Sequence, residues 1–253
     1  MTDAPARPVT IITGASRGIG AAIAERLAAD GHDLVLTYRD RAADADAVAR
    51  RCVSAGARVL VLQVDLADLE ATASVVPAAI AKFGRVTGLV NNAGITGMIG
   101  GFLDAPLEES EQLFRVNVLA PIALTRAAIA HMATDRGGAG GSIVNISSGA
   151  ARSGAPNTYI PYAMSKAALN ALTTGASKEF GPVGVRVNTV SPGTTRTEIH
   201  ATAGRPDAPD ERAPGIPMRR PGEPHEIAGA VAYLFSPDAS YTSGADIRVA
   251  GGN

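Results

Sequence analysis

The sequence predicts an α/β protein in which helices cover both faces of a parallel sheet. Short runs rich in Val, Ile and Leu alternate with longer stretches of helical periodicity, and a glycine-rich turn joins the first run to the first helix. This alternation is typical of parallel sheets with helical crossovers. At 253 residues with 46% hydrophobic content, the chain is long enough for one large core. We therefore expect a single domain over residues 1–253.

The pattern predicts seven strands and six long helices in alternation. We expect the strands at residues 9–13, 33–37, 58–64, 88–91, 141–147, 185–190 and 245–249. We expect the helices at about residues 18–30, 41–55, 68–83, 107–132, 162–180 and 224–235. Residues 149–161, between the fifth strand and the helix that begins near Tyr162, are expected to form a loop.

The first strand leads into a turn that contains Gly14, Gly18 and Gly20. A helix that begins in such a turn offers unpaired N–H groups to a phosphate, and each glycine lets the backbone approach closely. The spacing Gly-x-x-x-Gly-x-Gly differs from the usual Gly-x-Gly-x-x-Gly fingerprint, so a plain tight turn is the alternative. The strand before the turn and the helix after it favour a site for a dinucleotide.

Tyr162 and Lys166 lie four positions apart on a predicted helix and therefore one turn apart on one face. A nearby ammonium group lowers the pKa of a phenol by roughly 1–3 units, which favours proton transfer near neutral pH. The alternative is a solvated pair on the helix surface.

Composition narrows the possible partners. The net charge is −1 with interspersed signs, which indicates neither nucleic acid nor a membrane as a partner. The single cysteine, Cys52, cannot form an intramolecular disulfide and fits a reducing compartment. Residues 1–8 lack an apolar signal core, and we expect no transmembrane segment and a cytoplasmic location. His32, His131 and His225 have no ligand spacing, so we expect no metal.

Several motifs follow one another in a fixed order. They are Thr13-Gly14-x-x-x-Gly18-x-Gly20, Asn91-Asn92-Ala93-Gly94, Asn117, Ser147-Ser148, Tyr162-x-x-x-Lys166 and Pro192-Gly193-x-x-x-Thr197. With them the chain resembles the short-chain dehydrogenase/reductase family over essentially its whole length. It is most similar to uncharacterised bacterial oxidoreductases related to sugar dehydrogenases, and to 3-oxoacyl-carrier-protein reductases. The resemblance implies a Rossmann fold with strand order 3-2-1-4-5-6-7.

The resemblance also implies catalytic residues. Tyr162 would exchange a proton with the substrate oxygen, and Lys166 would lower the tyrosine pKa and bind the nicotinamide ribose. Asn117 would hold a water molecule that replenishes the proton. The active serine in the family most often lies thirteen residues before the tyrosine, but that position here is Gly149. Of Ser147 and Ser148 we choose Ser148, because the second serine usually serves in relatives that have the pair.

The cofactor can be predicted from charge. NAD-preferring members place an acidic residue at the end of the second strand, where this chain has Tyr38 followed by Arg39. Arg39 and Arg17 favour a 2′-phosphate, hence NADP(H), although Asp40 argues against it. Asp65 is expected at the adenine ring or, alternatively, as the cap of the helix near Asp68. The expected cofactor contacts are Gly14, Ser16, Arg17, Gly18, Ile19, Gly20, Tyr38, Arg39, Asp65, Leu66, Asn91, Ala93, Gly94, Tyr162, Lys166, Pro192, Gly193, Thr195 and Thr197.

The remaining expectations concern substrate, assembly and function. Residues 95–103 would line the substrate pocket, and residues 194–218, which include Arg196 and His200, would form a lid. In the family, the helix at 162–180 lies in a subunit interface, which implies a homotetramer or dimer. We expect an NADP(H)-dependent oxidoreductase that acts on a small carbonyl or secondary alcohol. A non-catalytic NADP(H) sensor and a nucleotide-sugar epimerase are the alternatives.

Overall fold

The computed structural model describes residues 7–253, and within them seven parallel strands form one sheet in the expected order. The order is β3-β2-β1-β4-β5-β6-β7, with β1 at the point where the chain reverses direction across the sheet. The strands are β1 (Val9–Ile12), β2 (Asp33–Tyr38), β3 (Val59–Gln63), β4 (Gly88–Asn91), β5 (Gly141–Ile146), β6 (Val185–Pro192) and β7 (Asp246–Val249). The predicted fold class is confirmed.

Helices follow the strands as the sequence predicts, with short additional turns. The α-helices are α1 (Gly18–Ala29), α2 (Ala42–Ser54), α3 (Leu69–Ala73), α4 (Val75–Phe83), α5 (Leu107–Phe114), α6 (Ala120–Met132), α7 (Ala150–Ser153), α8 (Ile160–Phe180), α9 (Ile199–Thr202), α10 (Ala208–Arg212) and α11 (Pro224–Phe235). A π-helical turn, η2 (Arg115–Leu119), joins α5 to α6. The 3₁₀ turns are η1 (Phe102–Asp104), η3 (Thr134–Arg136), η4 (Gly181–Val183), η5 (Ala213–Gly215) and η6 (Pro237–Ala239).

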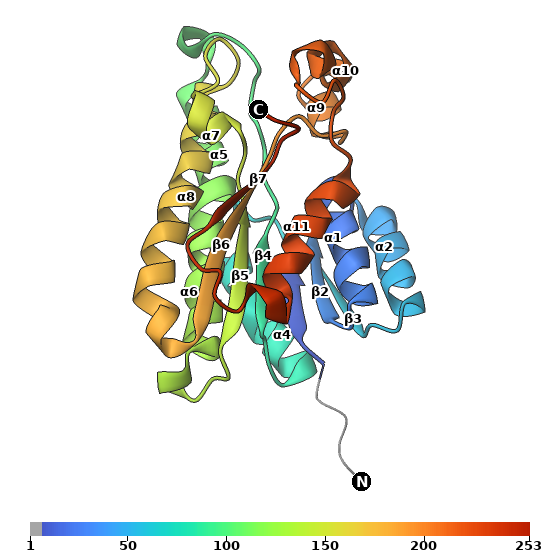
Figure 1. Ribbon diagram of the computed structural model, residues 1–253, viewed down its shortest axis with the longest axis vertical. Coiled ribbons are helices and arrows are strands. Elements are labelled where there is room, and N and C mark those ends of the chain that lie inside the picture. The colour runs from blue at the N-terminus through green and yellow to red at the C-terminus, as the bar shows by residue number, and fades with distance from the viewer. Residues whose placement is uncertain (1–6) are drawn as a thin grey trace.

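The sheet separates two hydrophobic layers. Helices α1, α2 and α11 cover one face and α4, α6 and α8 the other (Figure 1). Successive strand residues alternate between the layers, since Ile12 packs with the first group of helices and its neighbour Ile11 with the second. Both side chains are fully buried. Burial of an isoleucine stabilises the fold by about 1.5–3 kcal/mol. Because its side chains are buried on both faces of the sheet, each such strand is stabilised by both hydrophobic layers.

Two predicted helices differ from the regular α-helices that were expected. The stretch at 68–83 divides at Ser74 into α3 and α4. The N-cap of α3 is Asp68, whose Oδ1 accepts hydrogen bonds from the backbone N–H groups of Glu70 at 2.9 Å and Ala71 at 3.1 Å. The capping function considered for Asp65 therefore belongs to Asp68.

The stretch at 107–132 is continuous as a helix but contains the π-helical turn η2. By length and composition this helix could cross a membrane, which the sequence analysis did not expect. Over its most apolar window, 56% of the residues are buried inside the protein. Leu124 and Ala128, for example, are buried in the layer beneath α6. Packing against the sheet thus accounts for much of the apolar character of the helix.

The helix that carries Tyr162 begins at Ile160, two residues earlier than predicted. Pro161 occupies its first turn, where a missing N–H costs no intrahelical hydrogen bond. The preceding loop also contains the short helix α7. Residues 1–6 and the side chain of His200 lie outside the described part of the structure, and so do the expectations made for them.

Cys52 packs in the core on α2 and is fully buried. Burial raises the pKa of its thiol to about 11. The thiol is therefore protonated at neutral pH and is shielded from solvent, as expected for a packing residue.

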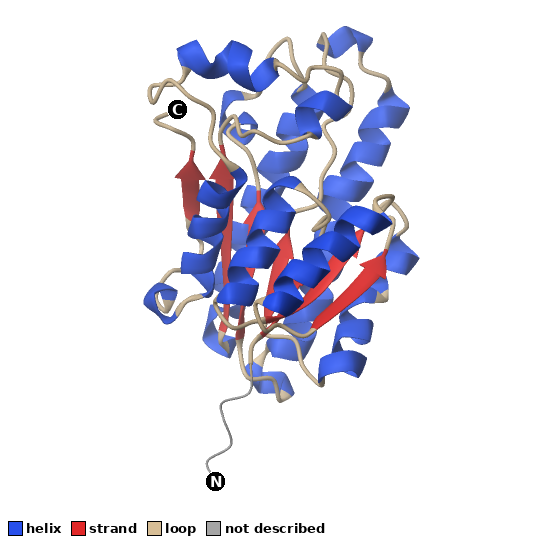
Figure 2. Cartoon of the chain, turned by 90° about the vertical axis from the view of Figure 1, so that its right-hand side faces the viewer, coloured by secondary structure: helices blue, strands red, loops and turns tan. Residues whose placement is uncertain are grey.

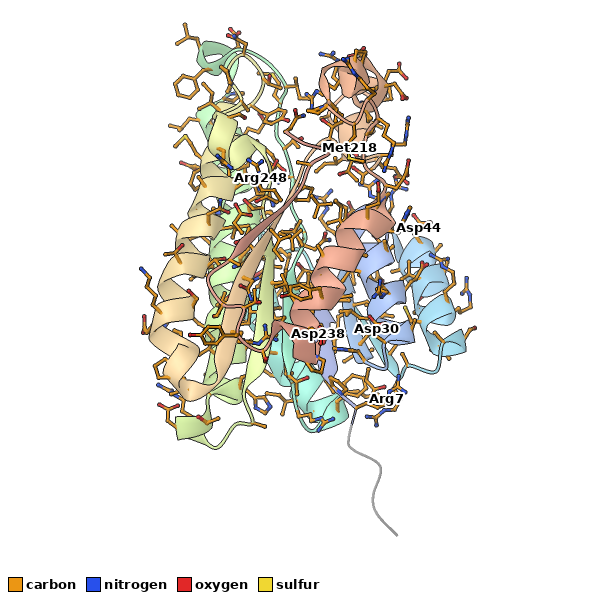
Figure 3. All side chains as sticks on the ribbon, in the orientation of Figure 1. Arg7, Asp30, Asp44, Met218, Asp238 and Arg248 are labelled. Carbon is orange, nitrogen blue, oxygen red and sulfur yellow. The ribbon has the colours of Figure 1, made fainter. Side chains whose placement is uncertain are left out.

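All strands point in the same direction, so their carboxyl ends meet along one edge of the sheet (Figure 2). Helices α9 and α10 lie beyond this edge (Figure 1). Figure 3 shows Met218 and Arg248 toward the same end of the molecule and Arg7 at the opposite end. The loops that carry the sequence motifs all leave the sheet at this edge, which is where open parallel sheets bind ligands.

Candidate active site

A large cleft opens at the carboxyl ends of the strands. Its volume is about 1130 Å³, above the roughly 300–1,000 Å³ typical of small-molecule sites. The cleft has room for a dinucleotide together with a small substrate. All the predicted catalytic and cofactor-binding residues line it except Asn91 and Asn117.

The glycine turn forms one wall of the cleft. Gly14 and Gly18 have φ angles of +64° and +55°, which side-chain-bearing residues rarely adopt. A Cβ at Gly20 would lie 2.3 Å from the carbonyl oxygen of Gly14, so only glycine fits there. No side chain caps α1, and its first turn has no acidic residue. Its first N–H groups and positive dipole end therefore suit a pyrophosphate, and the site fits a dinucleotide cofactor.

Asn92 connects the glycine turn to the end of β4. Its side-chain nitrogen donates to the carbonyl oxygens of Thr13 at 2.8 Å and Gly14 at 3.1 Å. In return, Thr13 Oγ1 accepts the backbone N–H groups of Asn92 and Ala93, each at 3.0 Å. Sequence reasoning did not single out Asn92, although it lines the cleft and belongs to the Asn-Asn-Ala-Gly motif.

Asn91 lies elsewhere, contrary to the expected cofactor contact. Its side chain is 2% exposed and donates to Thr125 Oγ1 at 3.1 Å and Asn145 Oδ1 at 2.8 Å. Neighbouring residues at a strand end point to opposite sides, so Asn92 turns toward the glycine turn while Asn91 turns into the core beside α6. The side chain of Asn91 therefore joins β4, β5 and α6.

Tyr162, Lys166 and Ser148 come together at the floor of the cleft. Tyr162 and Lys166 are buried on the first two turns of α8. The Lys166 ammonium lies 5.8 Å from the centre of the Tyr162 ring and donates to the carbonyl oxygen of Ile146 at 2.8 Å. Ser148, just beyond β5, also lines the cleft, and its hydroxyl group lies near enough to Tyr162 to lower the tyrosine pKa. This arrangement excludes the alternative of a solvated surface pair.

Burial controls the ionisation of both groups. It raises the pKa of Tyr162 to about 12, and the neighbouring Ser148 hydroxyl group acts in the opposite direction. Burial lowers the pKa of Lys166 to about 8. The sequence analysis expected the ammonium to lower the tyrosine pKa, but burial raises it, because the phenolate would lose its hydration when the side chain is removed from water. Tyr162 is thus a neutral phenol at pH 7, ready to give a proton.

The two adjacent serines differ in their surroundings. Ser147 is 3% exposed, and its Oγ donates to the carbonyl oxygen of Lys166 at 3.0 Å. This hydrogen bond connects the end of β5 to α8. Ser148 Oγ accepts the backbone N–H of Ala150 at 3.1 Å, which leaves its own hydrogen free to act toward Tyr162 or a ligand. The geometry favours the choice of Ser148.

Asn117 lies in the π-helical turn η2 and is fully buried. Its Oδ1 accepts the Ile95 N–H at 2.9 Å, and its Nδ2 donates to Ile95 O at 2.8 Å and Ser165 Oγ at 3.0 Å. Both amide hydrogens are therefore used. A Cβ at Gly94 would lie 3.2 Å from both Asn117 Oδ1 and Lys166 Nζ, so these two groups flank Gly94. π-helical turns frequently occur at functional sites.

Charged groups gather where β2 ends. Arg39 pairs with Asp40 at 2.7 Å. Arg41 lies 3.1 Å from Glu198, which also pairs with Arg17 of the glycine turn. All five side chains line the cleft. Asp40, the residue that argued against NADP(H), is held by Arg39, which lowers the pKa of Asp40 chiefly through their hydrogen bond.

Part of the cleft lining is apolar. Ile95, Gly97 and Ile99, from the segment expected to line a substrate pocket, line the cleft, but Met98 and Phe102 line a smaller depression outside it. Their side chains are 42% and 58% exposed. Tyr159 packs edge-on against Tyr162 with ring centres 5.1 Å apart and forms part of the cleft wall.

Comparison with known proteins places this fold and site in a class of oxidoreductases. A family model described as enoyl-(acyl carrier protein) reductase matches residues 14–253. The chain belongs to the short-chain dehydrogenase/reductase family. It is 38% identical over 244 residues to the uncharacterized oxidoreductase YgfF of Escherichia coli K12, covering 96% of this chain and 99% of YgfF.

Two similar solved structures contain a nucleotide. One is a blue fluorescent protein from a metagenomic library in complex with NADPH, 36% identical, with a TM-score of 0.88 over 97% of each chain. The other is a short-chain dehydrogenase from Burkholderia cenocepacia J2315 in complex with NADP, 35% identical. Its TM-score is 0.87, with 98% of this chain and 99% of that chain covered.

Proposed function

We propose that this enzyme uses NADP(H) to interconvert a carbonyl group and a secondary alcohol. The observation that carries the proposal is the meeting of Tyr162, Lys166 and Ser148 in the cleft that the glycine turn lines. Bound NADP(H) would supply or accept the hydride. The cleft has room for both the dinucleotide and a small substrate.

Tyr162 would give its hydroxyl proton to the carbonyl oxygen during reduction. Tyr162 carries this proton at pH 7, because burial raises its pKa to about 12. Ser148 would donate a second hydrogen bond to the same oxygen, which stabilises the negative charge that develops there. Lys166 would bind the ribose next to the nicotinamide and exchange protons with solvent, since a pKa of about 8 allows both of its states near neutral pH.

The main role of Asn117 would be to position neighbouring groups. Its side chain fixes the backbone of Ile95 and the hydroxyl of Ser165, and Ser165 Oγ donates to the carbonyl oxygen of Tyr162 at 2.7 Å. A water molecule beside Lys166 would be held by the remaining lone pair of Asn117 Oδ1 or by a backbone carbonyl of η2. Both of its amide hydrogens already have partners.

The preference for NADP(H) rests on positive charge near the expected ribose position. Arg17, Arg39 and Arg41 line the cleft beside Tyr38, where NAD-preferring relatives would have a carboxylate. Guanidinium groups bind phosphate in a bidentate, charge-assisted manner. The NADPH and NADP bound to two similar proteins support the same choice. Residues 194–218 would cover the bound cofactor as a lid, within a single domain.

We expect NADPH to bind at least about tenfold more tightly than NADH. A charge-assisted hydrogen bond contributes about 1.5–3 kcal/mol, so Arg39→Ala should weaken NADPH binding by about tenfold or more and change NADH binding little. Fluorescence titration of each nucleotide measures both effects. Arg205→Ala is a matched control, because Arg205 pairs with Glu211 and does not line the cleft. Equal affinities for the two nucleotides would contradict the cofactor assignment.

A turnover assay tests the proposed carbonyl reduction. The purified enzyme with NADPH should reduce at least one member of a panel of ketones, 3-oxoacyl thioesters and sugar lactones, with absorbance at the nicotinamide band as the readout. Binding of NADPH without turnover of any member would count against the proposed reaction and leave the cofactor assignment intact.

We further propose a homodimer or homotetramer that is located in the cytoplasm. Met164, Ala167, Ala171 and Gly175 are exposed along one face of α8, and Met164 is 53% exposed. Ala163, on the same helix, is buried inside the chain. Light scattering should give a mass two or four times that of the chain, and Ala171→Arg should lower it. A monomeric wild-type protein would contradict this proposal.

A further inference from the structure

Glu198 connects the lid segment to both walls of the nucleotide end of the cleft. It lies six residues beyond the end of β6 and just before α9. Its Oε2 accepts a hydrogen bond from Arg17 Nη1 in the glycine turn and lies 3.1 Å from Arg41 Nη1 after β2. One carboxylate oxygen is thus shared by two guanidinium groups that are 24 residues apart in the chain.

Neighbouring contacts strengthen this connection. Arg17 Nη2 donates to Thr202 Oγ1 at 3.5 Å, and Thr202 Oγ1 donates to the carbonyl oxygen of Glu198 at 3.0 Å. Arg41 also lies 3.3 Å from Asp44, which Figure 3 labels at the end of α2 nearest the lid. The side chains of Arg17, Glu198 and Arg41 are 33%, 52% and 48% exposed. A ligand entering the cleft can therefore reach all three.

A carboxylate and a phosphate compete for the same guanidinium groups, because both offer paired oxygens that match the planar fork. Arg17 and Arg41 cannot interact fully with a phosphate while both are paired with Glu198. The glutamate charge would also repel a phosphate placed between the two arginines. A nucleotide with only a 2′-hydroxyl meets neither obstacle.

We propose that Glu198 limits the preference for NADP(H) by competing with the 2′-phosphate for Arg17 and Arg41. This inference rests on the proposed use of NADP(H). Glu198 weakens NADP(H) binding selectively and leaves NAD(H) binding unaffected. Glu198 lies in the segment 194–218, so entry of the phosphate also detaches this segment from the glycine turn. When the phosphate leaves, Glu198 pairs with Arg17 and Arg41 again and the segment returns to the glycine turn.

The test removes the negative charge of Glu198 and keeps the shape of its side chain. Glu198→Gln in the full chain should bind NADPH about fivefold more tightly, since each exposed ion pair contributes about 0.2–1 kcal/mol and two are lost. The affinity for NADH should stay within about twofold. Adenosine 2′,5′-bisphosphate, which carries the phosphate without the nicotinamide, should gain as much as NADPH. Isothermal titration calorimetry measures all three without turnover.

Glu211→Gln is the matched control. Glu211 lies in the same segment with similar exposure, but it pairs with Arg205 at 2.6 Å, outside the cleft. Its substitution should leave the affinities for all three ligands within about twofold of wild type.

Three results would overturn the proposal. They are an unchanged or weaker affinity of Glu198→Gln for NADPH, an equal gain for NADH, and the same gain in Glu211→Gln. If the wild-type enzyme binds NADPH and the Arg39→Ala variant loses it, these results reject the competition alone. A wild-type enzyme with no affinity for NADPH would reject the cofactor assignment and the competition together.

Discussion

Tyr162→Phe is expected to slow carbonyl reduction by about 10²–10⁴-fold while NADPH binds as it does to the wild-type enzyme. The substitution removes one hydroxyl group, and a positioned proton donor contributes a rate factor of about that size. The ring keeps its packing, since Tyr162 is 8% exposed and rests against Tyr159, Leu113 and Ala163. Steady-state kinetics on the best ketone should show the loss in kcat, because the interaction is made in the transition state.

Two other tyrosines make the result specific. Tyr241 is fully exposed, and Tyr241→Phe should leave kcat unchanged. Tyr159→Phe should keep most of the activity, although Tyr159 lies beside Tyr162 in the same cleft. Turnover that persists in Tyr162→Phe, or a larger loss in Tyr159→Phe, would move the proton donor to another residue.

Lys166→Met is expected to abolish turnover and to make the protein more stable at pH 7. Burial lowers the pKa of Lys166 from 10.5 to about 8, which corresponds to about 3 kcal/mol of destabilisation while the amine is charged. Methionine fills a similar volume without charge. After the loss of the hydrogen bond to Ile146 O, worth about 1 kcal/mol, the net gain in unfolding free energy should be about 1–3 kcal/mol.

The gain should shrink as the pH rises above 8. Between pH 8 and 10.5 the unfolded chain still binds the proton that the folded enzyme has lost, so the wild-type protein becomes more stable with increasing pH. Lys166→Met lacks this dependence. Urea denaturation at pH 7, 8, 9 and 10 measures the difference. The series stops at pH 10 because Tyr162, with its pKa raised to about 12, contributes stability that is lost above that pH.

Lys178→Met is the control for this experiment, because Lys178 is exposed on the same helix. Its unfolding free energy should stay within about 0.5 kcal/mol of wild type at every pH. A Lys166→Met protein that is less stable at pH 7, or whose gain is independent of pH, would show that the buried amine carries no such cost.

Local chemistry in the sequence predicts much of the fold. The β-branched run before Gly14 and the apolar spacing of Ile23 and Leu27 predict a strand, a turn and a helix, and α1 begins at Gly18 as expected. The Tyr-x-x-x-Lys spacing places both functional groups on one face of α8. These features depend on neighbours within a few residues, so the pattern contains the information.

Other features depend on distant neighbours and could not be predicted. The raised pKa of Tyr162 comes from burial under elements that the spacing of two residues does not reveal. The choice between Asn91 and Asn92 depends on which side of β4 faces α6. Likewise, nothing near Arg41 in the sequence indicates that Glu198 binds it. The π-helical turn at Asn117 interrupts a stretch whose apolar spacing reads as one regular helix.

The strand order divides the cleft into two parts that are lined by different loops. Loops after β1, β2 and β3 line the end of the cleft that contains Arg17 and Arg39, whereas loops after β4 and β5 lie around Tyr162. The loop after β6 reaches Arg17 and Arg41 through Glu198. The segments 95–106 and 149–159 could therefore be exchanged for those of a relative with different substrate preference, and the chimera would keep its own nucleotide affinity. Such grafting would turn this enzyme into a scaffold for redesign without any change at Arg17 or Arg39.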